Sequence, residues 1–262
     1  MADQDLKAPQ PVIGALLASG FPFQTAVAQV VQHTPGCTLV TEEFPWQDET
    51  GADQFLDLVA QKGFFVLTIE CRKTRKETLT FLQPGGFFND VNLVRCVYLT
   101  QIPDSTHRME LRCGDKRLRP KSAESAFCVV STSYSGKDQR MLEPDAQRIV
   151  RGTDAYAQRY WHGFKTEHFP ESDRLFLPVI VTNAKVFVAD YDPADVSLET
   201  GELSKRPPAT ISPVPWVRFR KAFTTQGEHG NDRTVLVVTA TELRTFLDKL
   251  EEIPTTSSAQ LR

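Results

Sequence analysis

The sequence predicts one α/β domain in which a central mixed β-sheet is flanked by helices, and three observations support this fold class. Short apolar runs, some of alternating polarity, recur along the chain as they do in the strands of a packed sheet. Four segments instead carry apolar residues at helical spacing, at 12–17, 22–33, 144–161 and 239–250. The 262 residues have an ordinary hydrophobic content of 40% and charged content of 24%, and no stretch resembles a linker between independent domains.

The first third of the chain predicts two helices followed by three strands. The first helix is short and ends near Ser19-Gly20, and Pro22 is suited to the first turn of the second helix because its missing N–H costs nothing there. Pro35-Gly36 then breaks the chain. Strands are expected at 37–44, 54–60 and 64–73, with a turn at 61–63 between the last two.

The middle of the chain predicts further strands and one long helix. Strands are expected at 92–100 and 126–131, and the basic stretch 108–121 is consistent with either a hairpin or an extended insert. The helix at 144–161 has a continuous apolar stripe of Ala146, Ile149, Val150, Thr153, Ala157 and Tyr160. Apolar runs at 176–182 and 185–189 flank Asn183-Ala184, which predicts a tight hairpin.

The C-terminal part predicts a β-rich elaboration and a terminal helix. Strands are expected at 216–223 and 234–238, and Thr239 and Glu242 have capping-box spacing at the start of the last helix. We therefore expect a core at 10–190 with an insert at about 74–125, and an elaboration at 191–253 packed on the same domain. Residues 1–9 and 254–262 are expected to be disordered tails.

Two carboxylates in neighbouring predicted strands are the main functional signal. Asp57 lies in the centre of an apolar run, where a buried charge needs a partner, and Glu70 ends the next apolar run. Because side chains alternate along a strand, Glu70 and Arg72 face the same way, and Asp57 joins them if the register is right. Two acids can hold a divalent cation, and a cation beside them can balance the charge of a phosphate. This combination suits the hydrolysis of a phosphodiester.

The ending Glu70-Cys71-Arg72-Lys73, together with the order helix, strand, Asp57 strand, Glu70 strand, helix, strand, resembles the PD-(D/E)xK nuclease superfamily. The resemblance is closest over 19–82. It implies a restriction-endonuclease-like core and an endonuclease that hydrolyses DNA with Mg²⁺ or Mn²⁺. By position, Asp57 and Glu70 are similar to the metal-binding acids of the motif.

The chain departs from the motif at its lysine, since Arg72 stands at that position. Arginine stays protonated and offers a planar fork, so its role near a nucleophilic water differs from that of lysine. Lys73 is the neighbouring candidate, although a regular strand directs it to the opposite face. Leu56 replaces the proline of the motif. Gln24 is the candidate for the polar residue that members often contribute from the first helix.

Basic clusters are the candidates for nucleic-acid contacts, although the formal net charge of the chain is −3. The run after the Glu70 strand contains Arg75 and Lys76, and the stretch 112–121 contains Arg117 and Arg119. DNA is the expected partner, and RNA is an alternative that the sequence does not separate from it. The resemblance also implies a homodimer or a partner protein of a restriction or anti-phage system.

Two classes of function fit these observations. The first is an active metal-dependent endonuclease, and the second is a nuclease-derived module that binds nucleic acid or a protein without cutting. Arg72 in place of the motif lysine favours the second. No charged segment followed by an apolar core begins the chain, and five scattered cysteines form no Cys-x-x-Cys pair, so we expect a cytoplasmic protein with free thiols.

Overall fold

The structure is a computed structural model, and it describes residues 10–74, 77–85, 90–101, 109–132, 141–166, 173–204, 209–223 and 232–254. The predicted disordered segment 1–9 and nearly all of the predicted tail 254–262 lie outside these residues. No single described helix is long and apolar enough to span a membrane. One bent pair of helical segments, 11–18 and 21–32, passes that test by length and composition.

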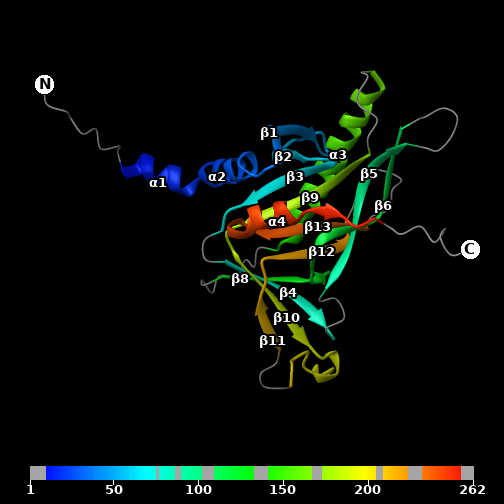
Figure 1. The fold of residues 1–262 in the computed structure, drawn as a ribbon. Coiled ribbons are helices and arrows are strands. Elements are labelled where there is room, and N and C mark those ends of the chain that lie inside the picture. The colour runs from blue at the N-terminus through cyan, green and yellow to red at the C-terminus, as the bar shows by residue number, and fades with distance from the viewer. Residues whose placement is uncertain are drawn as a thin grey trace, which may run out of the picture.

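A large mixed β-sheet forms the centre of the molecule (Figure 1). Its first three strands pair antiparallel in sequence order, and β9 and then β13 continue the sheet parallel to β3. The sheet ends with β12, which is antiparallel to β13, and the two-residue β7. In order across the sheet the strands are β1 (Cys37–Gln47), β2 (Asp53–Lys62), β3 (Phe65–Arg72), β9 (Arg174–Thr182), β13 (Asp232–Thr239), β12 (Trp216–Ala222) and β7 (Glu124–Ser125).

The segment predicted as an insert contributes a long hairpin to this sheet. Strand β5 (Val91–Gln101) pairs with β9 on the part that β13 leaves open, and β6 (Met109–Ser122) pairs antiparallel with β5. The basic stretch is therefore one long strand. Near the C-terminus, β14 (Glu251–Glu252) pairs with β6. Strands β12 and β13 come from the predicted C-terminal elaboration, so that segment supplies two strands of the central sheet.

A second sheet of four strands packs beside the first (Figure 1). Its order is β11 (Thr210–Pro213), β10 (Lys185–Tyr191), β4 (Glu77–Pro84) and β8 (Cys128–Thr132), with β10 parallel to β4. The chain passes from the large sheet to the small one three times, from β3 to β4, from β7 to β8 and from β9 to β10. Asn183 joins the first and last of these passages, because its side-chain oxygen accepts from the Thr74 amide at 2.7 Å and its amide group donates to the Thr74 carbonyl at 3.1 Å.

The predicted hairpin around Asn183-Ala184 is therefore wrong. Strand β9 is already paired with β3 on one edge and with β13 and β5 on the other, so neither edge is open to β10. Strand β10 pairs with β4 instead. The apolar runs themselves were placed correctly, and the error lies in their partners, which come from distant parts of the chain.

Helices cover both faces of the large sheet. On one face α2 (Phe21–Gln32) and α4 (Leu243–Lys249) pack over the apolar side chains of β3, β9 and β13. On the other face α3 (Glu143–Thr166) and the second sheet enclose a separate apolar core. The predicted stripe on α3 is confirmed, since Ala146, Ile149, Val150, Thr153 and Ala157 are buried. The predicted capping box is wrong, because the Thr239 hydroxyl donates to the carbonyl of Pro215 and accepts no hydrogen bond from the first N–H groups of the helix.

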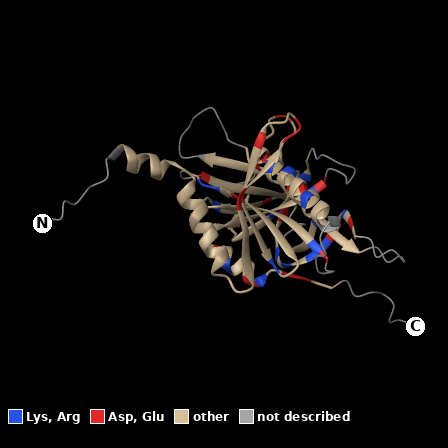
Figure 2. Cartoon of the chain, turned by 90° about the horizontal axis from the view of Figure 1, so that it is seen from above, with Lys and Arg blue, Asp and Glu red and all other residues tan. Residues whose placement is uncertain are grey.

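Helix α1 (Gln10–Ala18) projects from the body in both views and carries no charged residue (Figures 1 and 2). Its side chains Val12, Leu16 and Leu17 are exposed. Two short 3-10 turns complete the described elements, Pro193–Asp195 and Ala240–Glu242. All five cysteines are free, as predicted.

Candidate active site

The registers of the first three strands bring Asp57 and Glu70 together. Val59 is paired with Thr68, whose hydroxyl lies 2.5 Å from that of Thr153 on α3, so this pair faces α3. The last paired positions are Leu58 and Ile69, so Asp57 and Glu70 follow directly where β2 separates from β3. Glu70 shares the face of Thr68 and lies toward α3. Side-chain alternation is broken at Asp57, because Leu56 and Val59 both pack in the core beneath α3 while Leu58 packs on the opposite face.

Asp57 is held by a main-chain hydrogen bond. Its Oδ2 accepts from the amide of Cys71 at 2.6 Å. Burial raises the pKa of the Asp57 carboxyl, and the Cys71 amide and the charge of Arg148 partly oppose that rise. Its second oxygen makes no hydrogen bond to the described residues and is available to a ligand.

Glu70 is more deeply placed, with 7% of its surface exposed. Its Oε1 accepts a hydrogen bond from Nη2 of Arg148 on α3. Burial, reinforced by the negative charge of Asp57, raises the pKa of Glu70 to about 7 despite the attraction of Arg148. Two carboxylates that mutually disfavour ionisation are an arrangement typical of functional sites.

Arg148 is a residue of this candidate site that the sequence analysis did not identify. It lies 78 positions from Glu70 on the polar side of the α3 stripe, and Asp145, one turn earlier, is 3.9 Å from its guanidinium. Helix α3 approaches β2 so closely that a Cβ added to Gly152 would lie 2.5 Å from a methyl of Leu56. One sequence feature could have identified it, because Arg148 lies beside the apolar stripe of a helix that was expected to pack on the sheet.

Gln24 is brought to the same place from the other face of the sheet. Its Nε2 donates to the main-chain carbonyl of Asp57 at 3.1 Å, which fixes the strand that carries the acid. Glu43 on β1 lies beside Asp57, since the residue pairs on either side of it place the two opposite each other. It is exposed and has a φ of 50°, a strained backbone conformation for a residue other than glycine. The Glu43 charge contributes to the raised pKa of Asp57.

These groups line an open pocket of about 400 Å³, here called the acid pocket. Helix α2 contributes one wall, β2 and the end of β3 contribute the floor, and α3 contributes a cation. The lining residues are Gly20, Phe21, Gln24, Asp53, Gln54, Phe55, Asp57, Glu70, Cys71 and Arg148. The N-terminal end of α2 opens onto the pocket and adds partial positive charge.

Arg72 shares the face of Glu70, as predicted, but belongs to a different cluster. Its guanidinium forms ion pairs with Asp145 on α3 and, at 3.3 Å, with Glu77 at the start of β4. The Arg72 and Glu77 side chains are nearly buried. This Arg72 cluster holds both of the arginine's terminal nitrogens on carboxylates, so the structure gives no support to Arg72 as the group that addresses a substrate in the acid pocket.

Lys73 points to the opposite face from Arg72. Its ammonium donates to the carbonyls of Leu17 and Ser19, at the C-terminal end of α1. Lys73 therefore caps the C-terminal end of α1, where a cation interacts favourably with the helix dipole. The predicted catalytic role of Lys73 has no geometric support.

Of the predicted nucleic-acid contacts, the two that the structure describes, Arg117 and Arg119, do not line the acid pocket. Arg75 and Lys76 lie outside the described residues. Arg117 and Arg119 are exposed on β6, which pairs with β5 and β14, and Arg119 forms an ion pair with Glu251 at 2.8 Å. In Figure 1, β6 lies on the far side of the molecule from α2.

The acid pocket offers two carboxylates as ligands for a divalent cation. Among the described residues no three His, Cys, Asp or Glu side chains are close enough to form a metal-ligand group. Asp57 and Glu70 nevertheless provide two carboxylates whose mutual repulsion a cation would relieve, in a pocket open to water. Mg²⁺ usually keeps several waters and accepts one or two protein carboxylates, so this pair suffices for it.

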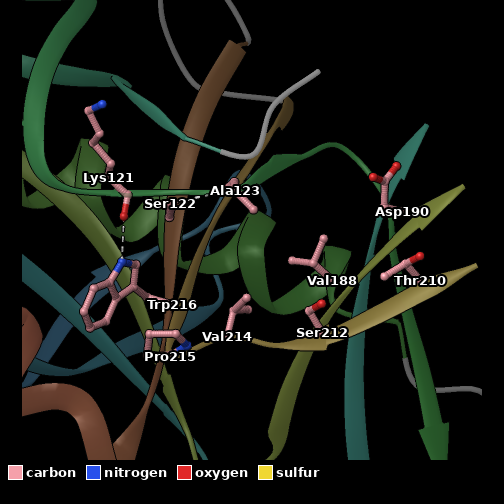
Figure 3. A pocket seen from close by; sticks show the side chains of 10 residues that line it. All are labelled: Lys121, Ser122, Ala123, Val188, Asp190, Thr210, Ser212, Val214, Pro215 and Trp216. Atoms are coloured by element: carbon pink, nitrogen blue, oxygen red, sulfur yellow. Dashed lines mark hydrogen bonds between the residues drawn. The ribbon is translucent and has the colours of Figure 1, made fainter. Parts of the chain in front are cut away.

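A second pocket of about 430 Å³ lies between the end of β6 and strands β10, β11 and β12 (Figure 3). Asp190 and Thr210 lie at one side of it, and Trp216, whose indole N–H donates to the Lys121 carbonyl at 3.0 Å, lies at the other (Figure 3). Its lining contains one carboxylate and several hydroxyls but no pair of acids. It lacks the charge arrangement that distinguishes the acid pocket.

Comparison of the chain with protein-family models, with curated proteins and with solved structures gives no match. The functional argument therefore rests on the residues and geometry above.

Proposed function

We propose that this protein is a metal-dependent nuclease that hydrolyses DNA phosphodiester bonds at the acid pocket. The observation that carries the proposal is the convergence of Asp57 and Glu70 on one open pocket, with the pKa of Glu70 raised to about 7 and a guanidinium beside it. Buried acids that repel each other cost stability, so a functional origin is the better explanation.

The strand order also supports the proposal. Helix α2 is followed by the antiparallel β1, β2 and β3, then, after the five strands β4 to β8, by α3, and then by β9 parallel to β3. This is the order that the resemblance to the PD-(D/E)xK nuclease superfamily implies, with the two acids on the second and third strands. A restriction-endonuclease-like core and a role in a restriction or anti-phage system are part of the same proposal.

The residues have distinct roles in this mechanism. Asp57 and Glu70 would hold Mg²⁺ or Mn²⁺, which supplies Lewis acidity toward a phosphate oxygen and lowers the pKa of a bound water. The Cys71 amide keeps the Asp57 carboxylate in place, and Gln24 holds the main-chain carbonyl of the same residue. Arg148, released from Glu70, turns its guanidinium toward the phosphate and balances the charge that develops there. Arg148 thus takes the role that the motif assigns to the residue at position 72.

Cleavage assays on plasmid and linear DNA, with Mg²⁺, Mn²⁺ or chelator, test this assignment. Asp57→Asn and Glu70→Gln are expected to slow cleavage on the order of 100-fold or more, whereas Asp248→Asn, an exposed acid on α4, is expected to cleave like the wild type. Arg148→Met is expected to bind Mn²⁺ more tightly, because a competing cation is gone, and yet to cut more slowly. Unchanged cleavage by both acid variants would refute the assignment.

A nuclease-derived binding module is the second candidate. It is favoured by one observation, namely that the residue at the motif-lysine position is held by Asp145 and Glu77 while Arg148 occupies Glu70. Calorimetry with Mn²⁺ separates the two candidates. An active site predicts saturable binding that Asp57→Asn abolishes, whereas the module predicts salt-sensitive nucleic-acid binding without cleavage in any metal.

A further inference from the structure

Two exposed aromatic rings stand at the acid pocket. Phe21, the first residue of α2, is 63% exposed, and Phe55, two residues before Asp57 on β2, is 51% exposed. Both line the pocket. Neither ring contacts another aromatic ring or a cation within the described part of the chain. Two large apolar side chains exposed to solvent beside charged groups indicate a ligand-binding surface.

The charges of the pocket show which part of a nucleic acid the walls can attract. Asp53, Asp57 and Glu70 line it against the single guanidinium of Arg148, which already pairs with Glu70. Proteins that grip the phosphate backbone usually do so with several Lys or Arg side chains. The lining contributed by the described residues has no such set, so we expect most of the affinity of a bound nucleotide to come from its base.

We propose that the acid pocket receives an unpaired nucleotide whose base stacks on Phe21 and Phe55 while its phosphate faces Asp57 and Glu70. The substrate class is then single-stranded nucleic acid, or an unpaired end or bulge, in preference to a continuous duplex. Every base has a face that can stack on an aromatic ring, and such a face is accessible only when the base leaves the helical stack. This inference rests on the proposed nuclease function, whose substrate it specifies.

Binding without cleavage provides the test. The full chain is titrated, in chelator and at low salt, with 2-aminopurine-labelled single strands of DNA and of RNA and with a hairpin duplex of the same sequence. Phe21→Leu and Phe55→Leu keep an apolar side chain but remove the ring, and Phe21→Tyr and Phe55→Tyr keep the ring. Phe127→Leu is the matched control, since Phe127 is 57% exposed next to β8, outside the acid pocket.

Each leucine variant is expected to weaken single-strand binding on the order of tenfold and to reduce the quenching of 2-aminopurine. The tyrosine variants and Phe127→Leu are expected to bind like the wild type, and the duplex is expected to bind more weakly than either single strand. Wild-type affinity in both leucine variants, or equal affinity for duplex and single strand, overturns the inference. The DNA and RNA arms show which sugar is accepted.

The cleavage assay with Asp57→Asn distinguishes failure of the stacking inference from failure of the nuclease proposal. Cleavage that depends on Asp57, combined with ring-independent binding, removes the stacking site and leaves the nuclease. Ring-dependent binding of single strands without cleavage in any metal removes the nuclease and leaves a binding pocket. Absence of binding to every nucleic acid, combined with absence of cleavage in any metal, overturns both.

Discussion

The acid pocket and the Arg72 cluster lie side by side between β3 and α3, yet they differ in balance and in access. In the Arg72 cluster one guanidinium is enclosed by two carboxylates, Asp145 and Glu77. In the acid pocket, Asp57 and Glu70 share a single guanidinium that is itself partly exposed, and the site opens to solvent. Asp145, which contacts both Arg72 and Arg148, links the two clusters.

The difference separates a structural ion pair from a candidate site. A buried pair whose groups are all satisfied stabilises a junction but offers nothing to a ligand. A pair of acids with raised pKa values and too little positive charge is poised to gain from an incoming cation. The motif lysine position therefore marks the structural cluster in this chain, and the available cation comes from α3.

The largest expected effect concerns the stability of the Arg72 cluster. Arg72→Met leaves the nearly buried Glu77 without its cation and Asp145 with only the more distant Arg148, so we expect a loss of about 3–5 kcal/mol in the free energy of unfolding. Arg148→Met is the matched variant, and because Arg148 is partly exposed its loss is expected to stay below about 1 kcal/mol. Urea denaturation measures both. Equal destabilisation by the two variants would contradict the distinction between the clusters.

The next effect concerns the dependence of stability on pH. Folding raises the pKa of Glu70 from 4.5 to about 7, so the folded protein holds this proton more tightly than the unfolded chain. Stability from this source is complete below pH 4.5 and is lost as pH rises through about 7, by about 3 kcal/mol in all.

Thermal melting of the chelated protein between pH 4 and 8 checks this loss. Glu70→Gln is expected to flatten the profile, because the amide does not titrate. Glu42→Gln, at an exposed position on β1, is expected to leave the wild-type profile unchanged. A wild-type profile that rises over this range would remove the electrostatic basis of the acid pocket.

Local sequence patterns predicted the parts of the site that depend on one or two adjacent strands. Period-two alternation assigned Glu70 and Arg72 to one face, and the short turn after β2 made Asp57 and Glu70 neighbours. The identity of the cation was not predictable in this way, because Arg148 reaches Glu70 from 78 residues away. The pairing of Arg72 with Asp145 depends on the same distant packing of α3.

The sheet topology likewise could not be predicted where it depends on contacts between distant parts of the chain. Helix α3 was predictable from its stripe because burial on one face imposes a helical period. The partner of β10 was not, since the choice between β9 and β4 depends on which sheet edges other segments occupy. The resemblance to a nuclease family located the two acids, but the roles of the two cations after Glu70 followed only from the arrangement in space.

The smallest expected effect concerns Lys73, the second cation of the motif. Because its ammonium binds the carbonyls that end α1, Lys73→Met is expected to cost under about 1 kcal/mol, mainly as fraying of that helix. Faster amide hydrogen exchange over Gln10–Ala18, with unchanged exchange over Phe65–Arg72, is the expected result. Metal-dependent cleavage is expected to match the wild type. If Lys73→Met instead abolishes cleavage while both exchange profiles stay unchanged, Lys73 acts in the acid pocket, and the division of the motif between a structural arginine, a capping lysine and a cation from α3 is wrong.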